Sequence, residues 1–351
     1  MQTVMIEHEN ENQRADKFLK RFLPAAASGF LYKMIRKKNI TLNGKKMSGN
    51  ELLHKGDQLS FFFSDETFQK FRGEENVNSL SSSKLEEYEQ YYLQNRSLSK
   101  IILETKDLLI INKPAGTLSQ KDEEGGYSLN EWVLGYLFCS KKISKDSFAF
   151  FKPSVGNRLD RNTSGIVLFG KTLCGSQKIS ELLRTHDAHK FYHVLVEGKL
   201  CGKGRIEAYL YKNQETNRVQ IIDKEGWSRL TNQEKEHYQL ILTEYRCICS
   251  NEQASYLEVE LFTGKTHQIR ASFLHIGHPI FGDPKYKTEK NRAVCEKLHI
   301  KRQMLHAYKI QFPVIEDSDF YMVSGKEIFC EEPDDFLKCK NYFFNEEKEL
   351  L

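Results

Sequence analysis

The 351-residue sequence lacks the features that mark several large classes of protein. No stretch approaches the roughly 18 consecutive apolar residues of a membrane span. The first nine residues show no basic region followed by an apolar one, which a secretion signal would have. We also find no internal repeat of the kind that builds solenoids or propellers. We therefore expect a cytoplasmic protein that is neither secreted nor embedded in a membrane.

Cysteine spacing and net charge exclude further classes. The eight cysteines form no C-x-x-C pair and no regular framework, which favours reduced thiols over disulfides or a zinc site. A net charge of +4 is too small by itself to indicate a nucleic acid as partner, so the distribution of charge must decide. Apolar residues are plentiful enough, at 39%, for two or three domains with a sizeable core.

A polar turn that runs into an apolar strand is the most informative stretch. Residues 157–165 read Asn-Arg-Leu-Asp-Arg-Asn-Thr-Ser-Gly, and four apolar residues follow. This pattern predicts a loop at the edge of a strand that is buried on both faces. Asp160 lies on the loop between Arg158 and Arg161, whose charges favour an ionised carboxylate. Asp160 is therefore a candidate nucleophile or base, although a role as a turn cap fits the same pattern.

The same region also matches a phosphate-binding loop letter for letter. Residues 165–172 fit G-x-x-x-x-G-K-[ST]. A phosphate cradle needs a flexible loop with free amides, whereas the four intervening residues here are expected to form the strand itself. We therefore reject the phosphate loop, and a nucleotide hydrolase remains only as an alternative.

Residues 13–63 are expected to form a compact unit with two basic helices and a small hairpin. The apolar spacing predicts helices over 14–23 and 28–38, and an Asn-Gly turn follows at 43–44. The segment resembles the ribosomal-protein-type RNA-binding module of the S-four kind, and a small domain with solvated charged faces is the alternative. Clustered cations favour contact with phosphates. The candidate RNA contacts are Lys17, Arg21, Lys33, Arg36 and Lys37.

The remaining chain is expected to contain a linker, a second domain and a tail. Residues 64–98 carry few core-forming side chains and are predicted to be a flexible linker that contains a short helix around residues 85–93. Residues 99–330 alternate many strands with a few helices, and residues 331–351 are predicted to be a tail that frays. The fold class is therefore α+β, with a small N-terminal α/β module followed by a mixed, mainly antiparallel sheet that is flanked by helices.

Further candidates for a site lie in the second domain. Lys113 stands in an Asn-Lys-Pro-Ala-Gly turn, which could present a lysine and backbone amides to a ligand or could simply be a turn. Tyr192 lies in a predicted strand from which it could reach a site. A helix with Thr266 as its N-cap would place His267 and Arg270 on one face. Histidines at 267, 275 and 278 have no matching acid, so we expect no zinc.

Five motifs in order resemble the RluA-type pseudouridine synthases, which isomerise uridine in structured RNA. They are residues 112–116, 157–165, 190–198, 263–270 with 277–283, and 305–307. The resemblance covers nearly the whole chain. It implies that Asp160 is the catalytic aspartate and that Arg270 is its partner. By the same resemblance Tyr192 is the ring near the uracil, Arg158 fills the gap left by the flipped base, and Leu305 is an apolar pocket wall.

Two departures from the family pattern bear on substrate fit more than on activity. Asn157 replaces the more usual histidine, and Ala271-Ser272 replace the common Val-His. The resemblance implies an isomerase without cofactor or metal, whose partner is structured RNA, most naturally ribosomal RNA; we expect a monomer. A non-catalytic RNA-binding or ribosome-assembly factor is the alternative. It would not need the combination of Asp160, Tyr192 and Arg270.

Overall fold

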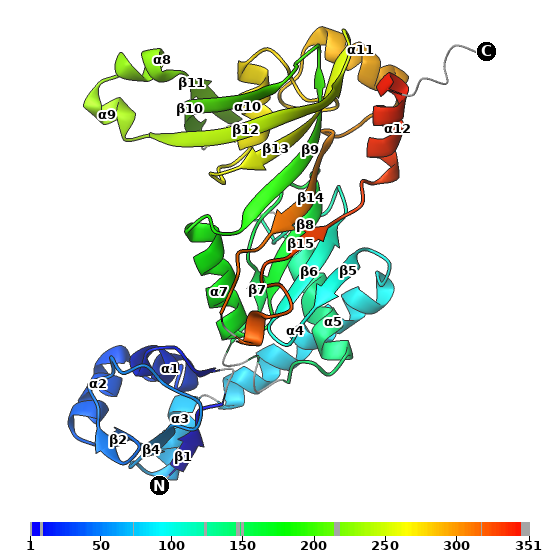
Figure 1. Cartoon of the computed structure of the whole chain (residues 1–351). Helices are drawn as coiled ribbons and strands as arrows, with labels where there is room; N and C mark the ends of the chain where they lie inside the picture. The colour runs from blue at the N-terminus through cyan, green and yellow to red at the C-terminus, as the bar shows by residue number, and fades with distance from the viewer. Residues whose placement is uncertain are drawn as a thin grey trace.

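The computed structural model describes residues 2–7, 10–72, 74–122, 125–144, 148, 151–213, 218–316 and 318–344. The N-terminal part contains a four-stranded antiparallel sheet in the order β1-β4-β2-β3, with three helices packed around it (Figure 1). Its elements are β1 (Gln2–Met5), α1 (Ala15–Phe22), α2 (Ser28–Arg36), β2 (Ile40–Leu42), β3 (Lys45–Lys46), β4 (Gln58–Phe61) and α3 (Asp65–Arg72).

This N-terminal unit extends beyond the predicted residues 13–63 at both ends. Strand β1 pairs with β4, with Gln2 opposite Phe61, so the unit begins before residue 13. Phe68 of α3 is buried and packs 5.3 Å from the Phe61 ring between centroids. Residues 65–72, which we predicted as linker, therefore belong to the first unit, because the aromatic side chain of Phe68 completes its core.

The second part is built on an 11-stranded sheet whose main path runs β11-β10-β12-β13-β9-β14-β8-β6-β5. The strands are β5 (Lys100–Glu104), β6 (Leu108–Lys113), β7 (Ser154–Val155), β8 (Ser164–Gly170), β9 (His189–Glu197), β10 (Lys203–Asn213), β11 (Arg218–Ile222), β12 (Tyr238–Ser250), β13 (Ala254–Leu261), β14 (Leu305–Gln311) and β15 (Glu327–Phe329). The helices are α4 (Glu74–Gln94), α5 (Leu129–Cys139), α7 (Leu173–Arg184), α8 (Lys224–Ser228), α9 (Asn232–Lys235), α10 (Gln268–His275), α11 (Glu289–Lys297), the 3-10 helix η2 (Ser318–Phe320) and α12 (Asp334–Phe344).

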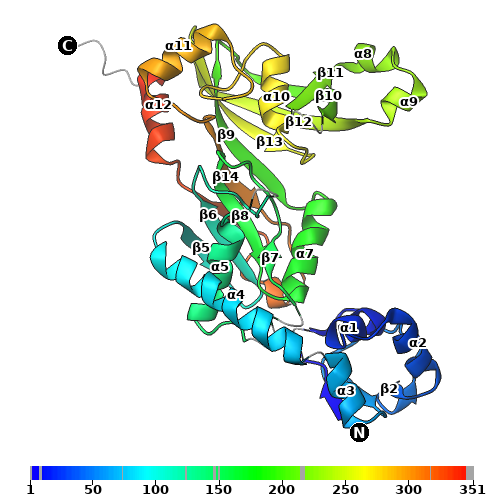
Figure 2. The ribbon, with the colours of Figure 1, turned by 180° about the vertical axis from the view of Figure 1, so that it is seen from behind.

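Helices cover both faces of the sheet around β6 (Figure 2). Leu109 and Ile111 of β6 pack in the cluster that contains α5, whereas Leu108 and Ile110 pack in the cluster that contains α7. This follows from the strand's period of two, which sends successive side chains to opposite faces. The apolar run at 166–169 lies in β8, where every residue is buried, so the predicted strand with two buried faces is confirmed.

Strands β8 and β14 form the parallel pair of an otherwise antiparallel sheet, as far as the described pairings go. Gly165 of β8 has φ +115°, and a Cβ atom there would lie 2.2 Å from the carbonyl oxygen of Ala307 in β14. Only glycine allows this close approach. It therefore brings the start of β14 beside the end of the polar turn that precedes β8. The mixed, mainly antiparallel sheet agrees with the predicted fold class.

The short helix expected around residues 85–93 of the linker is part of the longer helix α4, which packs on α5 and so belongs to the folded second part of the chain. Leu85 and Tyr88 are buried in the same cluster as α5. Gly135 of α5 lies so close to α4 that an added Cβ would be 2.1 Å from the carbonyl oxygen of Tyr88. Composition did not indicate this packing. A few apolar side chains of α4 are enough to bury one face of the helix, because Gly135 lets α4 approach α5 closely.

The predicted C-terminal tail also differs from the structure. Residues 334–344 form helix α12, in which Phe336 and Cys339 are buried in the main core cluster. These two side chains are three apart and so share one face of the helix. Residues 345–351 lie outside the described residues. Within the described chain, no helix is long and apolar enough to cross a membrane.

Candidate active site

The turn that carries Asp160 is held through its backbone carbonyls. The Ser119 hydroxyl donates to the carbonyl of Leu159 at 3.0 Å. The amide of Gly116 donates to the carbonyl of Arg161 at 2.9 Å, and Arg302 Nη1 donates to that of Asn162 at 3.3 Å. Donors from three other segments therefore fix the turn, and the Asp160 side chain needs no role in holding it.

Lys113, which we predicted to bind substrate, is fully buried and contacts this turn. Its Nζ donates to the carbonyls of Pro114 at 3.0 Å, Thr117 at 2.7 Å and Arg161 at 3.0 Å. Burial lowers the pKa of Lys113 to about 7, while the Asp160 charge opposes that shift. Three carbonyl acceptors use all three N–H donors of an ammonium group. Lys113 is therefore a positioning residue that ties the 113–117 turn to the Asp160 turn.

Arg270 joins two carboxylates. Its Nη1 donates to Asp160 Oδ2 at 2.7 Å, while Nε and Nη2 donate to the two oxygens of Asp283 at 2.6 and 2.9 Å. Burial would lower the pKa of Arg270, but the hydrogen bonds and charges of Asp283, followed by those of Asp160, raise it overall. The planar guanidinium offers five donors in a fixed fork, which suits this double contact.

Asp283 was not identified from the sequence, although it ends a motif that we had singled out. Its side chain is fully buried. Besides the two bonds from Arg270, it accepts from the backbone amides of Lys285 at 2.8 Å and Tyr286 at 3.0 Å. An acid that follows a candidate arginine in a Gly-rich motif is the signal that could have found it. Its satisfied carboxylate holds Arg270 in one orientation.

His267 and Tyr286 are further neighbours of Asp160. His267 Nε2 lies 4.0 Å from Asp160 Oδ2, and its Nδ1 is 3.0 Å from the hydroxyl of Tyr286. That hydroxyl accepts from the amide of Val219 at 3.0 Å. Burial lowers the pKa of His267 to about 4, although the charge of Asp160 opposes this shift; the charge of Arg270 acts in the same direction as burial. His267 is therefore a neutral neighbour of the carboxylate at neutral pH.

The predicted helix over 266–277 is shorter at its start than expected. Helix α10 begins at Gln268, and its N-cap is His267 in the left-handed region with φ 54°, not Thr266. The Gln268 side chain accepts from the amide of Lys265 at 3.1 Å and from the Thr263 hydroxyl at 2.9 Å. This local network replaces the expected threonine cap, and it directs His267 toward Asp160.

The other predicted site residues take three kinds of position. Tyr192 of β9 is buried, and its pKa is raised by burial and then by the charge of Asp160, which places the ring in the electrostatic reach of that carboxylate. Leu305 of β14 is buried in the same core cluster as Tyr192. Arg158 is exposed on the turn, two residues before Asp160. The Asp160 side chain itself is 27% exposed, so substrate can reach it.

The apparent phosphate loop is not a loop in the structure. Residues 165–170 belong to β8, and Thr172 is the N-cap of α7, accepting from the amide of Gly175 at 3.1 Å. Lys171 Nζ is bound to Glu104 at 2.8 Å. Among the described residues no group of three or more His, Cys, Asp or Glu side chains could hold a metal ion.

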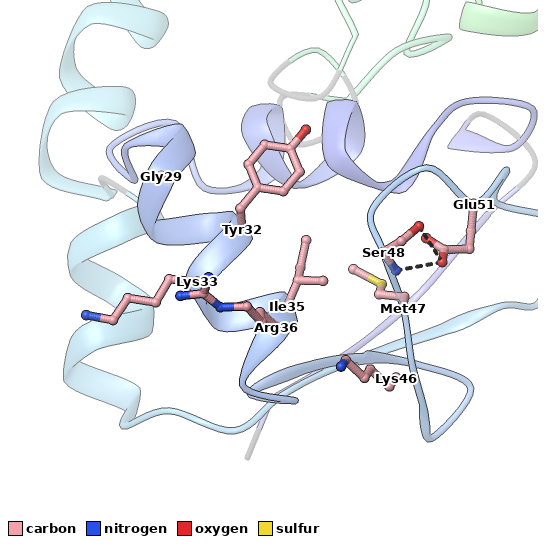
Figure 3. A pocket seen from close by; sticks show the side chains of 9 residues that line it. All are labelled: Gly29, Tyr32, Lys33, Ile35, Arg36, Lys46, Met47, Ser48 and Glu51. Atoms are coloured by element: carbon pink, nitrogen blue, oxygen red, sulfur yellow. Dashed lines mark hydrogen bonds between the residues drawn. The ribbon is translucent and has the colours of Figure 1, made fainter.

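A second candidate surface is a groove of about 680 Å³ in the N-terminal unit (Figure 3). Lys33 and Arg36 of α2 line it with Lys46, whereas Glu51 is bound to the backbone and hydroxyl of Ser48 at 2.6 and 2.9 Å. The exposed Lys17 and Lys37 do not line the groove. Arg21 is half-buried, and burial lowers its pKa, so it is the least accessible of the five predicted RNA contacts.

Comparison with known proteins adds independent evidence. Residues 107–275 match the family described as RNA pseudouridylate synthase. The chain is 27% identical to an uncharacterized RNA pseudouridine synthase of Mycoplasma genitalium, over 92% of each chain. It is 28% identical to the ribosomal large subunit pseudouridine synthase C of Vibrio parahaemolyticus, over 89% of this chain and 88% of the relative.

One further relative and one solved structure are also pseudouridine synthases by name. The ribosomal large subunit pseudouridine synthase D of Zymomonas mobilis is 29% identical over 65% of this chain and 67% of its own. The solved structure of human RNA pseudouridylate synthase domain containing 4 has a TM-score of 0.53 at 18% identity, over 72% of this chain and 95% of that one, and so supports the fold. The matched family region contains the Asp160 turn, Tyr192 and Arg270. Residues 107–275 therefore form an RNA pseudouridylate synthase domain, and the names of the relatives support an isomerase of the RluA type that acts on RNA.

Proposed function

We propose that this enzyme converts specific uridines to pseudouridine in the RNA of the large ribosomal subunit. Two relatives are named ribosomal large subunit pseudouridine synthase, one C and one D, and this chain matches most of the length of each. Such a substrate agrees with the cytoplasmic location that the sequence led us to expect.

The arrangement around Asp160 is the observation that carries the chemical part of the proposal. The carboxylate is 27% exposed, while the arginine that holds it is 5% exposed and is itself held by the fully buried Asp283. A reactive group that is reachable but oriented from behind is what catalysis by a positioned carboxylate requires. Asp160 is therefore the proposed catalytic residue, and Arg270 orients it.

The reaction is a balanced isomerisation. The bond between N1 of uracil and C1′ of ribose breaks, a bond between C5 and C1′ forms, the C5 proton leaves to solvent, and N1 gains a proton. Nothing is oxidised or reduced, and no cofactor is needed. Asp160 could attack the sugar, attack the base, or remove a proton from the sugar, and all three routes use the same carboxylate.

Base flipping accounts for the remaining proposed roles. A target atom inside a stack is out of reach, so the nucleotide must be extruded at a cost of a few kcal/mol. Arg158, exposed on the Asp160 turn, is suited to fill the gap that the base leaves. The ring of Tyr192 is proposed to lie against the uracil, and Leu305 to complete the apolar wall. Both side chains are almost fully buried now, so part of this wall opens only when the base enters.

The N-terminal unit is proposed to be an RNA-binding module of the S-four kind. Four exposed cations offer sequence-independent phosphate contacts: Lys17 of α1, Lys33 and Arg36 of α2, and Lys37 directly after α2. Lys46 lies in the same groove as Lys33 and Arg36 and is added to that set. The half-buried Arg21 is kept as a weaker contact.

Tritium release tests the proposal. A large-subunit ribosomal RNA transcript, made without modifications and labelled with tritium at uridine C5, should lose tritium to water when the protein is added. An unmodified small-subunit transcript serves as the matched control. Release from neither RNA would overturn the proposed substrate, and equal release from both would overturn its specificity.

A further inference from the structure

A cavity of about 450 Å³ lies directly behind the Asp160 turn. It is lined by Asn162 of that turn, by Gly116 of the neighbouring turn, and by Lys301 and by Lys338 of α12. Asn162 is two residues from Asp160, so their Cα atoms are separated by at most about 7 Å. The cavity is therefore adjacent to the reacting centre, yet none of the proposed roles uses it.

The charge around this cavity is positive. Arg302, 7% exposed, forms its base and is bound by both oxygens of Asp335 at 2.5 and 2.6 Å. Asp335 neutralises the charge of Arg302, so the excess positive charge at the cavity comes from Lys301 and Lys338. Lys301 and Lys338 are exposed, and neither makes an ion pair with a described residue. His299, which also lines the cavity, adds a further donor.

Arg302 also connects this cavity to the catalytic turn. Its Nη1 donates to the carbonyl of Asn162 at 3.3 Å, while its neighbour Gln303 donates to the Thr163 hydroxyl at 3.1 Å. The cavity is thus a built part of the molecule: its base is a buried guanidinium fixed at one side by an acid and at the other by the turn. An anion seated there would be held at a set distance from Asp160.

We infer that this cavity, between the Asp160 turn and α12, binds a backbone phosphate of the RNA strand that carries the target uridine. The inference rests on the proposed function. An extruded nucleotide leaves the stack with its flanking phosphates rotated outward, and those phosphates need fixed cationic partners. Two unpaired lysines at the rim of a cavity of this size suit one phosphate and its sugar.

A double variant that removes two positive charges from the cavity tests the site. The variant Lys301→Gln/Lys338→Gln changes two exposed side chains, and Lys106→Gln/Lys326→Gln is the matched control. Lys106 precedes β6 and Lys326 precedes β15, both at the ends of the sheet away from the Asp160 turn. Affinity for the large-subunit transcript is measured by filter retention over a series of salt concentrations, and kcat and KM are measured by tritium release.

The cavity variant should raise the Kd and KM about tenfold, leave kcat within about threefold, and make the dependence of log Kd on log salt shallower by roughly 0.7 per lost contact. The control pair should match the parent in all three. Salt slopes that coincide for the cavity pair and the parent would overturn the inference. A fall in kcat at unchanged slope would also overturn it, because that result would mean a merely structural role. Absence of tritium release by the parent would count against the proposed function alone, since filter retention still decides the phosphate site.

Discussion

Arg270 and Asp160 are joined by a hydrogen bond of 2.7 Å between Nη1 and Oδ2, although 110 residues separate them in the chain. The arginine side chain is 5% exposed and the aspartate side chain is 27% exposed, so the pair is anchored on one side and open on the other. The anchor extends to Asp283, which takes the other edge of the guanidinium. The orientation of the candidate catalytic carboxylate therefore depends on a residue that does not touch it.

Replacement of Asp160 by Asn should abolish isomerisation and leave RNA binding intact. An amide oxygen can still accept from Arg270, so the turn keeps its shape, but the carboxylate chemistry is lost. We expect tritium release to fall at least about 10³-fold, and RNA affinity to change by less than about threefold. Turnover close to that of the parent would remove Asp160 from its proposed role.

Two substitutions test the orientation of Asp160: one replaces Arg270 itself, and the other replaces Asp283, which anchors Arg270. Arg270→Lys keeps the positive charge but cannot bridge two carboxylates with a rigid fork, so kcat should fall by about 10²-fold while the fold is kept. Asp283→Asn should give a smaller loss of kcat, because the Asp160 contact remains but loses its support. Both are expected to act on kcat more than on KM.

Arg246→Lys is the matched control for these substitutions. Arg246 also binds a carboxylate, that of Glu258 at 2.8 Å, but it is 54% exposed on the same sheet. An exposed pair contributes little to stability, and this one touches no proposed site residue. An Asp283→Asn enzyme with unchanged kcat would show that Asp160 is oriented without the anchor.

Lys113 was predicted to contact substrate, and its burial changes that expectation. Lys113→Met should lower the free energy of unfolding by a few kcal/mol, because it removes donors from three carbonyls. It should also reduce kcat, since one of those carbonyls belongs to Arg161 beside Asp160. Thermal denaturation and tritium release measure the two effects. A variant of parental stability with a raised KM alone would restore the role in substrate binding.

The sequence predicted the chemistry better than it predicted the boundaries. The Asp160 turn and the buried strand after it follow from turn formers and an apolar run. The pairing of Arg270 with Asp160 was expected from the resemblance to the RluA-type synthases, whereas helical spacing predicted only that His267 and Arg270 share a face. Asp283 was not assigned, because its role depends on a contact with Arg270, thirteen residues earlier, and the motif that Asp283 ends does not by itself show that contact. The burial of Lys113 was missed for the same reason, since a lysine in a turn gives no sign of which carbonyls surround it.

The errors at 64–98 and at the C-terminal end share one physical cause. Both segments are rich in polar residues, so their composition resembles linker. In the structure a few apolar side chains per helix, such as Tyr88 in α4 and Phe336 in α12, are buried against the sheet domain. Tertiary packing determines whether such segments form stable helices, and the composition of a single sequence does not show that packing.

His306 predicts a dependence of stability on pH. Its ring is fully buried, with Nδ1 2.9 Å from the Ser164 hydroxyl and Nε2 3.2 Å from the carbonyl of Cys330. Burial lowers its pKa to about 4, with the charges of His193 and Arg302 acting in the same direction and that of Glu332 against it. A lowered folded pKa means that the unfolded chain binds the proton more readily.

The stability contributed by neutral His306 is therefore present above about pH 6.5 and is lost as the pH falls toward 4. Between pH 7 and pH 5 the loss should be about 2 kcal/mol for this group alone. His306→Gln should flatten the slope of unfolding free energy against pH in that window. Equal slopes for His306→Gln and the parent would show that the buried ring is not the group that titrates.

The division of labour between the two parts of the chain gives the final prediction. The variant that tests it is a deletion of the N-terminal unit. The deletion should end at residue 72 and not at residue 63, because Phe68 of α3 completes the N-terminal core. Deletion of residues 1–72 should weaken RNA affinity and make its salt dependence shallower, because the exposed cations of α1 and α2 leave with the segment. The intrinsic step should suffer less, since Asp160, Arg270 and Asp283 all remain.

Full-length Lys33→Gln/Lys37→Gln separates phosphate contact from any other effect of the deletion. Lys33 is exposed on α2 and Lys37 is exposed directly after it, so their replacement should not disturb the core. If they bind phosphates, this variant reproduces part of the reduced salt slope, by roughly 0.7 to 0.9 per contact, at unchanged kcat. Salt slopes that agree among the parent, the deletion and the double variant would mean that the N-terminal helices do not contact phosphate. The affinity for RNA would then have to come from the sheet domain and its cationic cavity beside Asp160.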